Sequence, residues 1–182
     1  MHTYQELDSF EYWSITDKDQ FSISVLKGLI MDAVRKANSG HPGGAMSSAD
    51  FIYLLFKDYL KFDPKDPNWF DRDRFILSGG HMSMLQYGIL HLVGWMKLSE
   101  IKKFRQLGSQ TPGHPEVEIP GVECTTGPLG QGFAMGVGMA LAEAYLSSLI
   151  SNDDKDSKKL IDHFTYVLAT DGDLQEPVAL GA

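Results

Sequence analysis

The sequence predicts an α/β fold with a mainly parallel sheet flanked by helices. Segments with helical spacing of apolar residues alternate with short segments typical of β-strands, which favours strands joined by crossover helices. An Asp-Gly pair follows the second predicted strand, at the end where open α/β sheets bind ligands. The 182 residues, 43% of them hydrophobic, suffice for one domain with a sizeable core.

Two helices are predicted in the first third of the chain. Apolar residues recur at helical spacing over residues 26–37, with Thr16 or Asp17 as the start signal and Gly40 as the stop. A second, mostly buried helix is predicted over residues 51–60.

A short strand at residues 74–77 is expected to run into a tight turn that places His81 just beyond it. Helices follow at residues 82–93 and 99–107, the second with Ser99 as its cap. Prolines and glycines then dominate residues 108–130. Loops of this length are usually functional.

The last part of the chain predicts a helix, a strand and a ligand-binding turn. Small residues recur through the helix predicted at residues 131–150, so it can pack closely on its neighbours. A buried strand is predicted at residues 164–169, and Asp171 and Gly172 follow it. A further helix is expected to begin near Glu176.

Composition excludes several classes of function. The net charge of −8, from 24 acidic and 16 basic residues, argues against a broad basic surface for nucleic acid or an anionic membrane. No apolar run is expected to be long enough to cross a bilayer. The single cysteine cannot form an intramolecular disulfide, and the first residues do not resemble a signal peptide. We therefore expect a cytoplasmic protein.

Three histidines stand in glycine- or proline-rich segments. His41 follows a predicted helix, His81 follows a strand, and His114 lies between two prolines that stiffen its backbone. Imidazole exchanges protons near neutral pH, so each histidine is a candidate for catalysis or binding. The alternative for His41 and His81 is a surface histidine at an ordinary turn.

A fourth cluster combines residues 125–132 with residues 170–172. A glycine-rich loop that enters a helix can present its amides to a diphosphate, and an aspartate at a strand end can hold magnesium beside it. Each half alone is weak evidence for a diphosphate site, because an Asp-Gly pair after a strand is often a simple turn.

Taken together, these segments resemble the transketolase family, in order and in wording, over most of residues 20–181. Such long ordered strings are more specific than any single glycine motif. The matching strings are KANSGHPG at residues 36–43, RDRF at 72–75 with LS at 77–78, FRQLGS at 104–109, TPGHPE at 111–116 and TTGPLGQG at 125–132.

The resemblance implies the thiamine-diphosphate-binding fold. Residues 1–182 would be a partial diphosphate-binding domain, incomplete at the carboxyl terminus. The complete enzyme would transfer a two-carbon ketol unit from a ketose phosphate to an aldose phosphate in the pentose phosphate pathway. Its cofactors would be thiamine diphosphate and Mg²⁺ or Ca²⁺. A partner would supply the pyrimidine-binding domain, either as a homodimer of the full-length form or as a separate carboxy-terminal subunit.

The resemblance also implies roles for individual residues. His41 would act in catalysis and contact substrate near the reacting carbon, while His81 would lie between cofactor diphosphate and substrate. His114 would act in catalysis and bind the donor's terminal hydroxyl. The other implied positions are Gly127, Pro128, Leu129, Asp171 and Gly172 at the cofactor, with Asp171 as metal ligand, and Glu176 near the subunit interface.

Two residues depart from the family's pattern. Thr170 replaces the usual glycine before the signature aspartate, and Pro177 replaces the glycine after the family's glutamate. The remaining signature residues lie beyond Ala182, so we expect the isolated chain to be inactive. Two alternatives stay open: a fragment of dihydroxyacetone synthase, which shares these motifs, and a non-catalytic truncated remnant or assembly partner.

Overall fold

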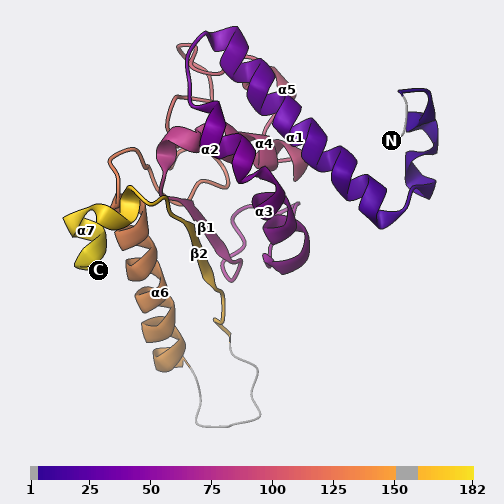
Figure 1. Ribbon diagram of the computed structural model, residues 1–182. Coiled ribbons are helices and arrows are strands. Elements are labelled where there is room, and N and C mark those ends of the chain that lie inside the picture. The colour runs from indigo at the N-terminus through magenta and orange to yellow at the C-terminus, as the bar shows by residue number, and fades with distance from the viewer. Residues whose placement is uncertain (1–3, 151–159) are drawn as a thin grey trace.

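A two-stranded parallel sheet lies between two helical layers in the computed structural model, which describes residues 4–150 and 160–182. Strand β1 (Arg74–Leu77) pairs with β2 (Thr165–Leu168) in the register Arg74 to Thr165 through Leu77 to Leu168. Helix α6 (Gln131–Ile150) packs along one face, while the helices from the first half of the chain lie on the other side (Figure 1). The expected α/β class with parallel strands is confirmed.

Side chains of β1 alternate between the two helical layers, as the two-residue period of a strand requires. Phe75 and Leu77 are buried in the main core, where the Phe75 ring meets Phe56 edge to face. Ile76 points the other way, toward α6. Strand β2 is half-buried along its whole length, so the expectation of a buried second strand is wrong. Among the described residues β2 pairs only with β1, and its outer edge has no neighbouring strand.

Helix α1 (Ile15–Ala37) is longer than its apolar stretch suggested. Its cap is Ser14, whose hydroxyl accepts a hydrogen bond from the amide of Asp17, so the predicted caps are wrong. The helix ends at Ala37, and its C-cap Asn38 adopts the left-handed conformation two residues before the predicted stop at Gly40.

The rest of this layer consists of shorter helices. Phe51 and Tyr59 are 59% and 71% exposed, so the second predicted helix is less buried than expected. The helix predicted at residues 99–107 corresponds to the much shorter α5 (Leu98–Ile101). Its cap is Lys97 instead of the predicted Ser99. The elements are α2 (Pro42–Ser47), α3 (Ala49–Leu54) with a π-helical turn (Leu55–Tyr59), α4 (Ser83–Leu92) and α5 (Leu98–Ile101).

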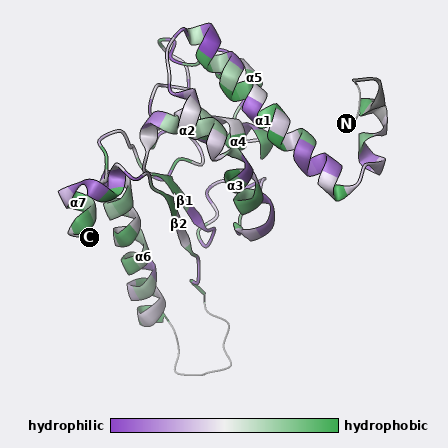
Figure 2. Ribbon diagram, viewed as in Figure 1, coloured by the Kyte–Doolittle hydropathy of each residue, from purple (hydrophilic) through white to green (hydrophobic). Residues whose placement is uncertain are grey.

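Helix α6 has the predicted bounds, and it packs closely on the sheet at Gly132 and Gly136 as its small residues suggested. Its apolar character runs along most of its length (Figure 2), and only a few of its residues, among them Gly132 and Gly136, are buried. By length and composition it could cross a membrane, so the expectation that no apolar run is long enough is wrong. A single such helix is weak support for a membrane span, because core helices of soluble proteins pass the same test.

Residues 108–130 contain no helix or strand, as predicted, yet side-chain contacts hold this segment in place. Glu123 forms ion pairs with Arg72 and Arg74 at the start of β1. The chain closes with a 3₁₀ turn (Asp173–Gln175) and the short helix α7 (Pro177–Leu180), which packs against α6 (Figure 1).

Candidate active site

The carboxyl ends of both strands meet at one edge of the sheet. The turn after β1 carries Ser78 and His81, and the turn after β2 carries Thr170 and Asp171. A Cβ added to Gly79 would lie 2.7 Å from Thr170 Cγ2, so the two turns touch. Parallel strands bring their following turns together in this way, and ligands of open α/β sheets bind there.

His41 and His81 come together from separate helical segments. His41 caps α2 at its amino end, and His81 lies in a 3₁₀ turn (Gly80–Met82). Their ring centroids are 5.3 Å apart in an edge-to-face arrangement. His41 is exposed and His81 half-buried, so both imidazoles are accessible from solvent.

The His114 loop is held by two side chains of α4. The Tyr87 hydroxyl lies 3.0 Å from the carbonyl of Pro112 and 3.1 Å from that of His114, and the Ser83 hydroxyl donates to the carbonyl of Gly113 at 2.9 Å. Burial raises the pKa of Tyr87 far above its usual value, so this phenol stays a donor. The loop backbone is therefore fixed although it has no regular structure.

His114 lies within reach of the charges of His41 and His81. Desolvation lowers its pKa most, and the positive charges of Arg105, His41 and His81 lower it further. The guanidinium of Arg105 packs against Gly113, where an added Cβ would lie 3.1 Å from its Cζ, and donates to the Ser39 hydroxyl at 2.8 Å. These contacts join the His114 loop to the segment before His41.

The glycine-rich loop approaches this histidine cluster. A Cβ added to Gly127 would lie 3.5 Å from the His114 ring, and one added to Gly80 would lie 2.9 Å from the Gly127 amide nitrogen. The Gly80 position therefore has no room for a Cβ, whereas a Cβ at Gly127 would make an ordinary van der Waals contact with the imidazole. Thr126 Oγ1 is buried and has no hydrogen-bond partner among the described residues, so the cradle holds a polar group that a ligand can satisfy.

The end of the same loop contacts the turn after β2. Leu129 Cδ1 would be 3.3 Å from a Cβ placed on Gly172, and a Cβ on Gly130 would be 2.8 Å from the Cβ of Glu176. Pro128, between them, is exposed. All nine predicted site residues therefore lie on segments that meet at this edge of the sheet.

Asp171 is the metal ligand that the resemblance implies. Its carboxylate is exposed and makes no hydrogen bond or ion pair within the described parts of the chain. No group of three or more His, Cys, Asp or Glu among those residues is arranged to hold a metal. An unengaged carboxylate beside a glycine-rich cradle fits magnesium that takes most of its oxygen ligands from phosphate and water.

Asp173 is the residue that sequence reasoning missed. It is fully buried, and its carboxylate accepts hydrogen bonds from Ser78, Gly130 and Thr170. Burial by itself raises the pKa of this carboxyl, but these hydrogen bonds outweigh it and hold the pKa below its usual value. The Gly130 amide is therefore already occupied and is not free for a diphosphate.

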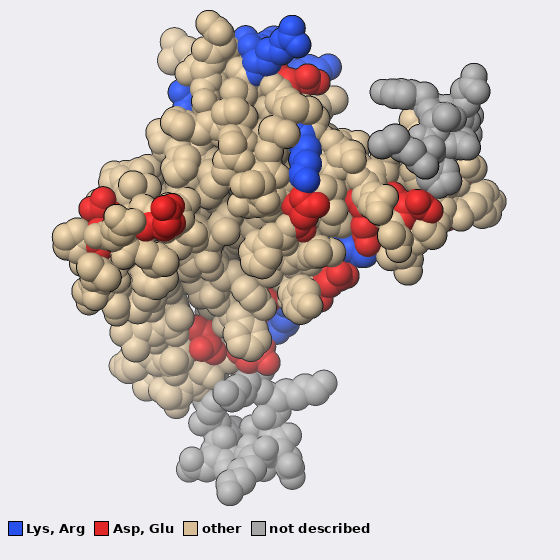
Figure 3. Space-filling view, in the orientation of Figure 1, with Lys and Arg blue, Asp and Glu red and all other residues tan. Residues whose placement is uncertain are grey.

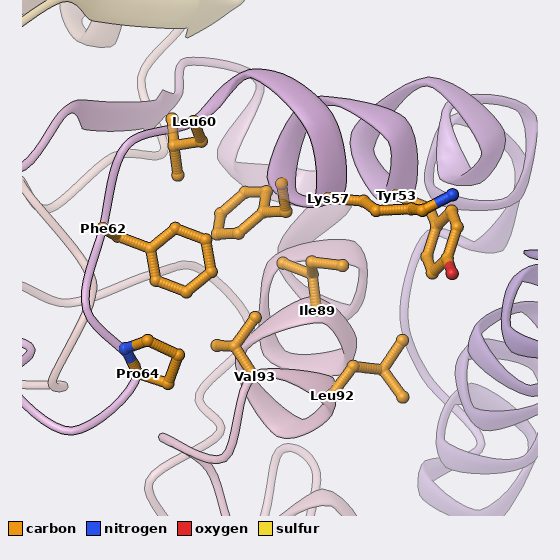
Figure 4. Close-up of a pocket in the computed structure, with 9 residues that line it drawn as sticks. Tyr53, Lys57, Leu60, Phe62, Pro64, Ile89, Leu92 and Val93 are labelled. Carbon is orange, nitrogen blue, oxygen red and sulfur yellow. The ribbon is translucent and has the colours of Figure 1, made fainter. Parts of the chain in front are cut away.

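An apolar hollow of about 580 Å³ lies elsewhere, between the end of α3, its π-helical turn and the end of α4. Its lining is mostly apolar, and Lys57 turns its ammonium toward the Tyr53 side (Figure 4). That ammonium is paired with Asp19 at 2.7 Å. The hollow shares no residue with the histidine cluster and has no group suited to a diphosphate.

On the face shown in Figure 3, charges are scattered between uncharged stretches, without a broad basic surface.

Residues 18–182 match the family model described as transketolase, thiamine diphosphate binding domain. The chain belongs to the transketolase family. It is 53% identical over 164 residues to a transketolase of Staphylococcus epidermidis, covering 90% of this chain and 24% of that protein. It is 54% identical over 158 residues to transketolase 2 of Escherichia coli, covering 86% and 23%.

Solved transketolase structures agree with this membership. A Pichia stipitis transketolase in complex with sedoheptulose 7-phosphate superposes with a TM-score of 0.84 at 48% identity, covering 89% of this chain and 24% of that one. The Leishmania mexicana transketolase superposes with a TM-score of 0.84 at 43% identity, again covering 89% of this chain and 24% of that one. The chain spans about a quarter of the length of the transketolases it matches.

Proposed function

We propose that this chain is the diphosphate-binding part of a transketolase that moves a two-carbon ketol unit from a ketose phosphate to an aldose phosphate. The observation that carries the proposal is the convergence of His41, His81 and His114 with the glycine-rich loop and Asp171, in a chain of this family. A related Pichia stipitis enzyme is described in complex with sedoheptulose 7-phosphate, a ketose phosphate.

The three histidines suit proton transfer to and from a carbonyl and hydroxyl groups. His114, whose lowered pKa favours the neutral imidazole, would bind the donor's terminal hydroxyl. His41 would contact substrate near the reacting carbon, and His81 would lie between substrate and cofactor diphosphate. Thiamine diphosphate supplies the carbanion chemistry when bound, which leaves these residues to orient groups and move protons.

The cradle and Asp171 would hold the diphosphate and its metal. The Gly127 amide and the unpaired Thr126 hydroxyl lie against Gly80, in the turn that carries His81, and Leu129 lies against Gly172. Pro128 would line the cofactor with them. Asp171 would give one oxygen to Mg²⁺ or Ca²⁺, and phosphate oxygens and water would complete the coordination.

The proposed assembly is a cytoplasmic enzyme of the pentose phosphate pathway in which residues 1–182 form a partial domain. The pyrimidine end of the cofactor would be bound by a second domain from a partner chain, in a homodimer or as a separate carboxy-terminal subunit. Glu176, at the amino end of α7 beside Gly130, is the proposed interface residue.

Cofactor and transfer assays test this function. The 182-residue chain is titrated with thiamine diphosphate and Mg²⁺ by calorimetry, then assayed with a ketose-phosphate donor and an aldose-phosphate acceptor. We expect weak cofactor binding and no turnover until carboxy-terminal domains are supplied. Tight binding together with turnover by this chain alone would refute the half-site argument. If the chain neither binds cofactor nor turns over substrate after carboxy-terminal domains are supplied, a non-catalytic remnant is favoured. If the completed enzyme prefers formaldehyde as acceptor, dihydroxyacetone synthase is favoured.

A further inference from the structure

One buried carboxylate connects three segments of the candidate site. Asp173 Oδ1 accepts from the Ser78 hydroxyl at 2.9 Å and from the Gly130 amide at 2.7 Å. The Ser78 hydroxyl accepts in turn from the Phe133 amide at 3.0 Å. The end of β1 and the start of α6 are thereby tied to the turn that follows β2.

The other carboxylate oxygen is bound by Thr170. Oδ2 of Asp173 accepts from the Thr170 amide at 2.7 Å and from its hydroxyl at 2.8 Å. The Asp173 amide donates back to the same hydroxyl at 3.2 Å. A glycine at this position, as the family usually has, would remove the hydroxyl that both donates and accepts here.

The two residues enclose Asp171 and Gly172. Thr170 and Asp173 are hydrogen-bonded to each other across these two residues, so the backbone between them has little freedom. The Asp171 carboxylate nevertheless stays exposed. On the other side of the cradle, the anchored Gly130 fixes the end of the glycine-rich loop. When residues behind a metal-binding side chain are removed, the site binds its metal more weakly, because that side chain is no longer held in place.

We propose that Thr170 and Asp173 form a clamp that positions Asp171 and residues 127–130 for a metal-bound diphosphate. The inference rests on the proposed function, to which it adds two positioning residues. Neither residue needs to touch the ligand: Asp173 is fully buried, and the Thr170 hydroxyl is taken up by Asp173.

Isosteric variants of Thr170 test the clamp. Thr170→Val keeps the shape and loses the hydroxyl, Thr170→Ser keeps the hydroxyl, and Asp173→Asn leaves fewer acceptor sites for Thr170. The control is Asp58→Asn, an exposed carboxylate on the π-helical turn of the opposite layer. Amide hydrogen exchange is measured on the cofactor-free 182-residue chain, and binding of thiamine diphosphate with Mg²⁺ is followed by phosphorus NMR, which detects weak complexes.

We expect Thr170→Val and Asp173→Asn to speed exchange at residues 127–133 and 170–175 while α1 and α4 keep their protection. Both variants should weaken cofactor binding by about tenfold or more, and Thr170→Ser should restore most of it. Equal acceleration in α1 and α4 would show a merely structural role and overturn the clamp, as would unchanged local exchange or unchanged affinity.

The two proposals fail separately. If the wild-type chain and its completed form bind no thiamine diphosphate, the proposed function fails, and the exchange pattern still decides whether Thr170 and Asp173 order residues 127–130 and 170–172. If the wild-type chain binds and the variants bind equally well, the function stands and the clamp is refuted.

Discussion

His114 shows how the surroundings of one residue set its chemistry. Its ring is close enough to His41, His81 and Arg105 for their positive charges to lower its pKa, in addition to the effect of desolvation. Two prolines and the contacts from Ser83 and Tyr87 hold its backbone. A neutral imidazole is therefore presented on a stiff loop.

We predict that His114 titrates below the ordinary histidine value of about 6.5. Because its folded-state pKa is depressed, the stability linked to this group is present above the unfolded pKa and is lost as pH falls through the folded pKa. Ring-proton NMR measures the titration, with His114→Gln to assign the signal. Arg105→Met, which removes a neighbouring positive charge, should raise the His114 pKa. A pKa at or above the ordinary value would contradict the prediction.

Asp171 gives a second prediction at the residue scale. Asp171→Asn exchanges a charged oxygen ligand for a neutral one, so thiamine diphosphate binding should require more Mg²⁺, with the metal affinity reduced by about tenfold or more. Calorimetric titration at several Mg²⁺ concentrations measures this. His114→Ala is the matched comparison: it should weaken donor use in the completed enzyme more than cofactor binding. Unchanged magnesium dependence would remove Asp171 from the metal site.

At the scale of elements, α6 approaches the sheet through its glycines. A Cβ on Gly136 would lie 2.4 Å from Val167 Cγ2, and one on Gly132 would lie 2.6 Å from the Ser78 Cα. The close contact lets the amide of Phe133 in α6 reach Ser78, and Gly130 just before the helix reaches Asp173, so the glycines of this helix help to build the candidate site.

Two glycine substitutions in the same helix should have opposite effects. Gly136→Ala should lower the free energy of unfolding by about 1–3 kcal/mol through overpacking against Val167, less the helix-propensity gain of about 1 kcal/mol. Gly138 has nothing within 4 Å of an added Cβ, so Gly138→Ala should stabilise the fold by up to about 1 kcal/mol. Denaturant unfolding followed by circular dichroism compares them. Equal effects of the two substitutions would refute the close-packing argument.

At the scale of the whole molecule, α6 leaves an apolar face uncovered. Leu141, Tyr145 and Leu149 are spaced four residues apart and are 70%, 62% and 64% exposed. An apolar stripe of this kind favours association. The charge distribution in Figure 3 leaves the region over α6 largely uncharged.

We predict that the 182-residue chain self-associates through this stripe. Leu141→Lys combined with Leu149→Lys should shift it toward the monomer, as measured by light scattering after size-exclusion chromatography. Leu107→Lys is the control, because Leu107 is a fully exposed leucine outside the stripe. Association that persists in the double variant, or that Leu107→Lys abolishes equally, would count against α6 as the contact.

The sequence by itself determined the chemistry-bearing segments and the strongly patterned elements. The bounds of β1 and α6 coincide with those predicted, and the long loop before α6 has no helix or strand. Local signals near helix ends were less reliable. Several residues could cap α1, and the choice of Ser14 depends on which hydroxyl reaches a free amide.

The tertiary structure alone decided what the two neighbouring aspartates do. Asp171 and Asp173 are the same residue type two positions apart, yet one is exposed and the other fully buried. The donors that make burial of Asp173 tolerable are Ser78 and Gly130, which are distant in sequence, and the amide and hydroxyl of Thr170. A buried carboxylate is stable only where such donors converge, and their convergence depends on how the strands and α6 pack.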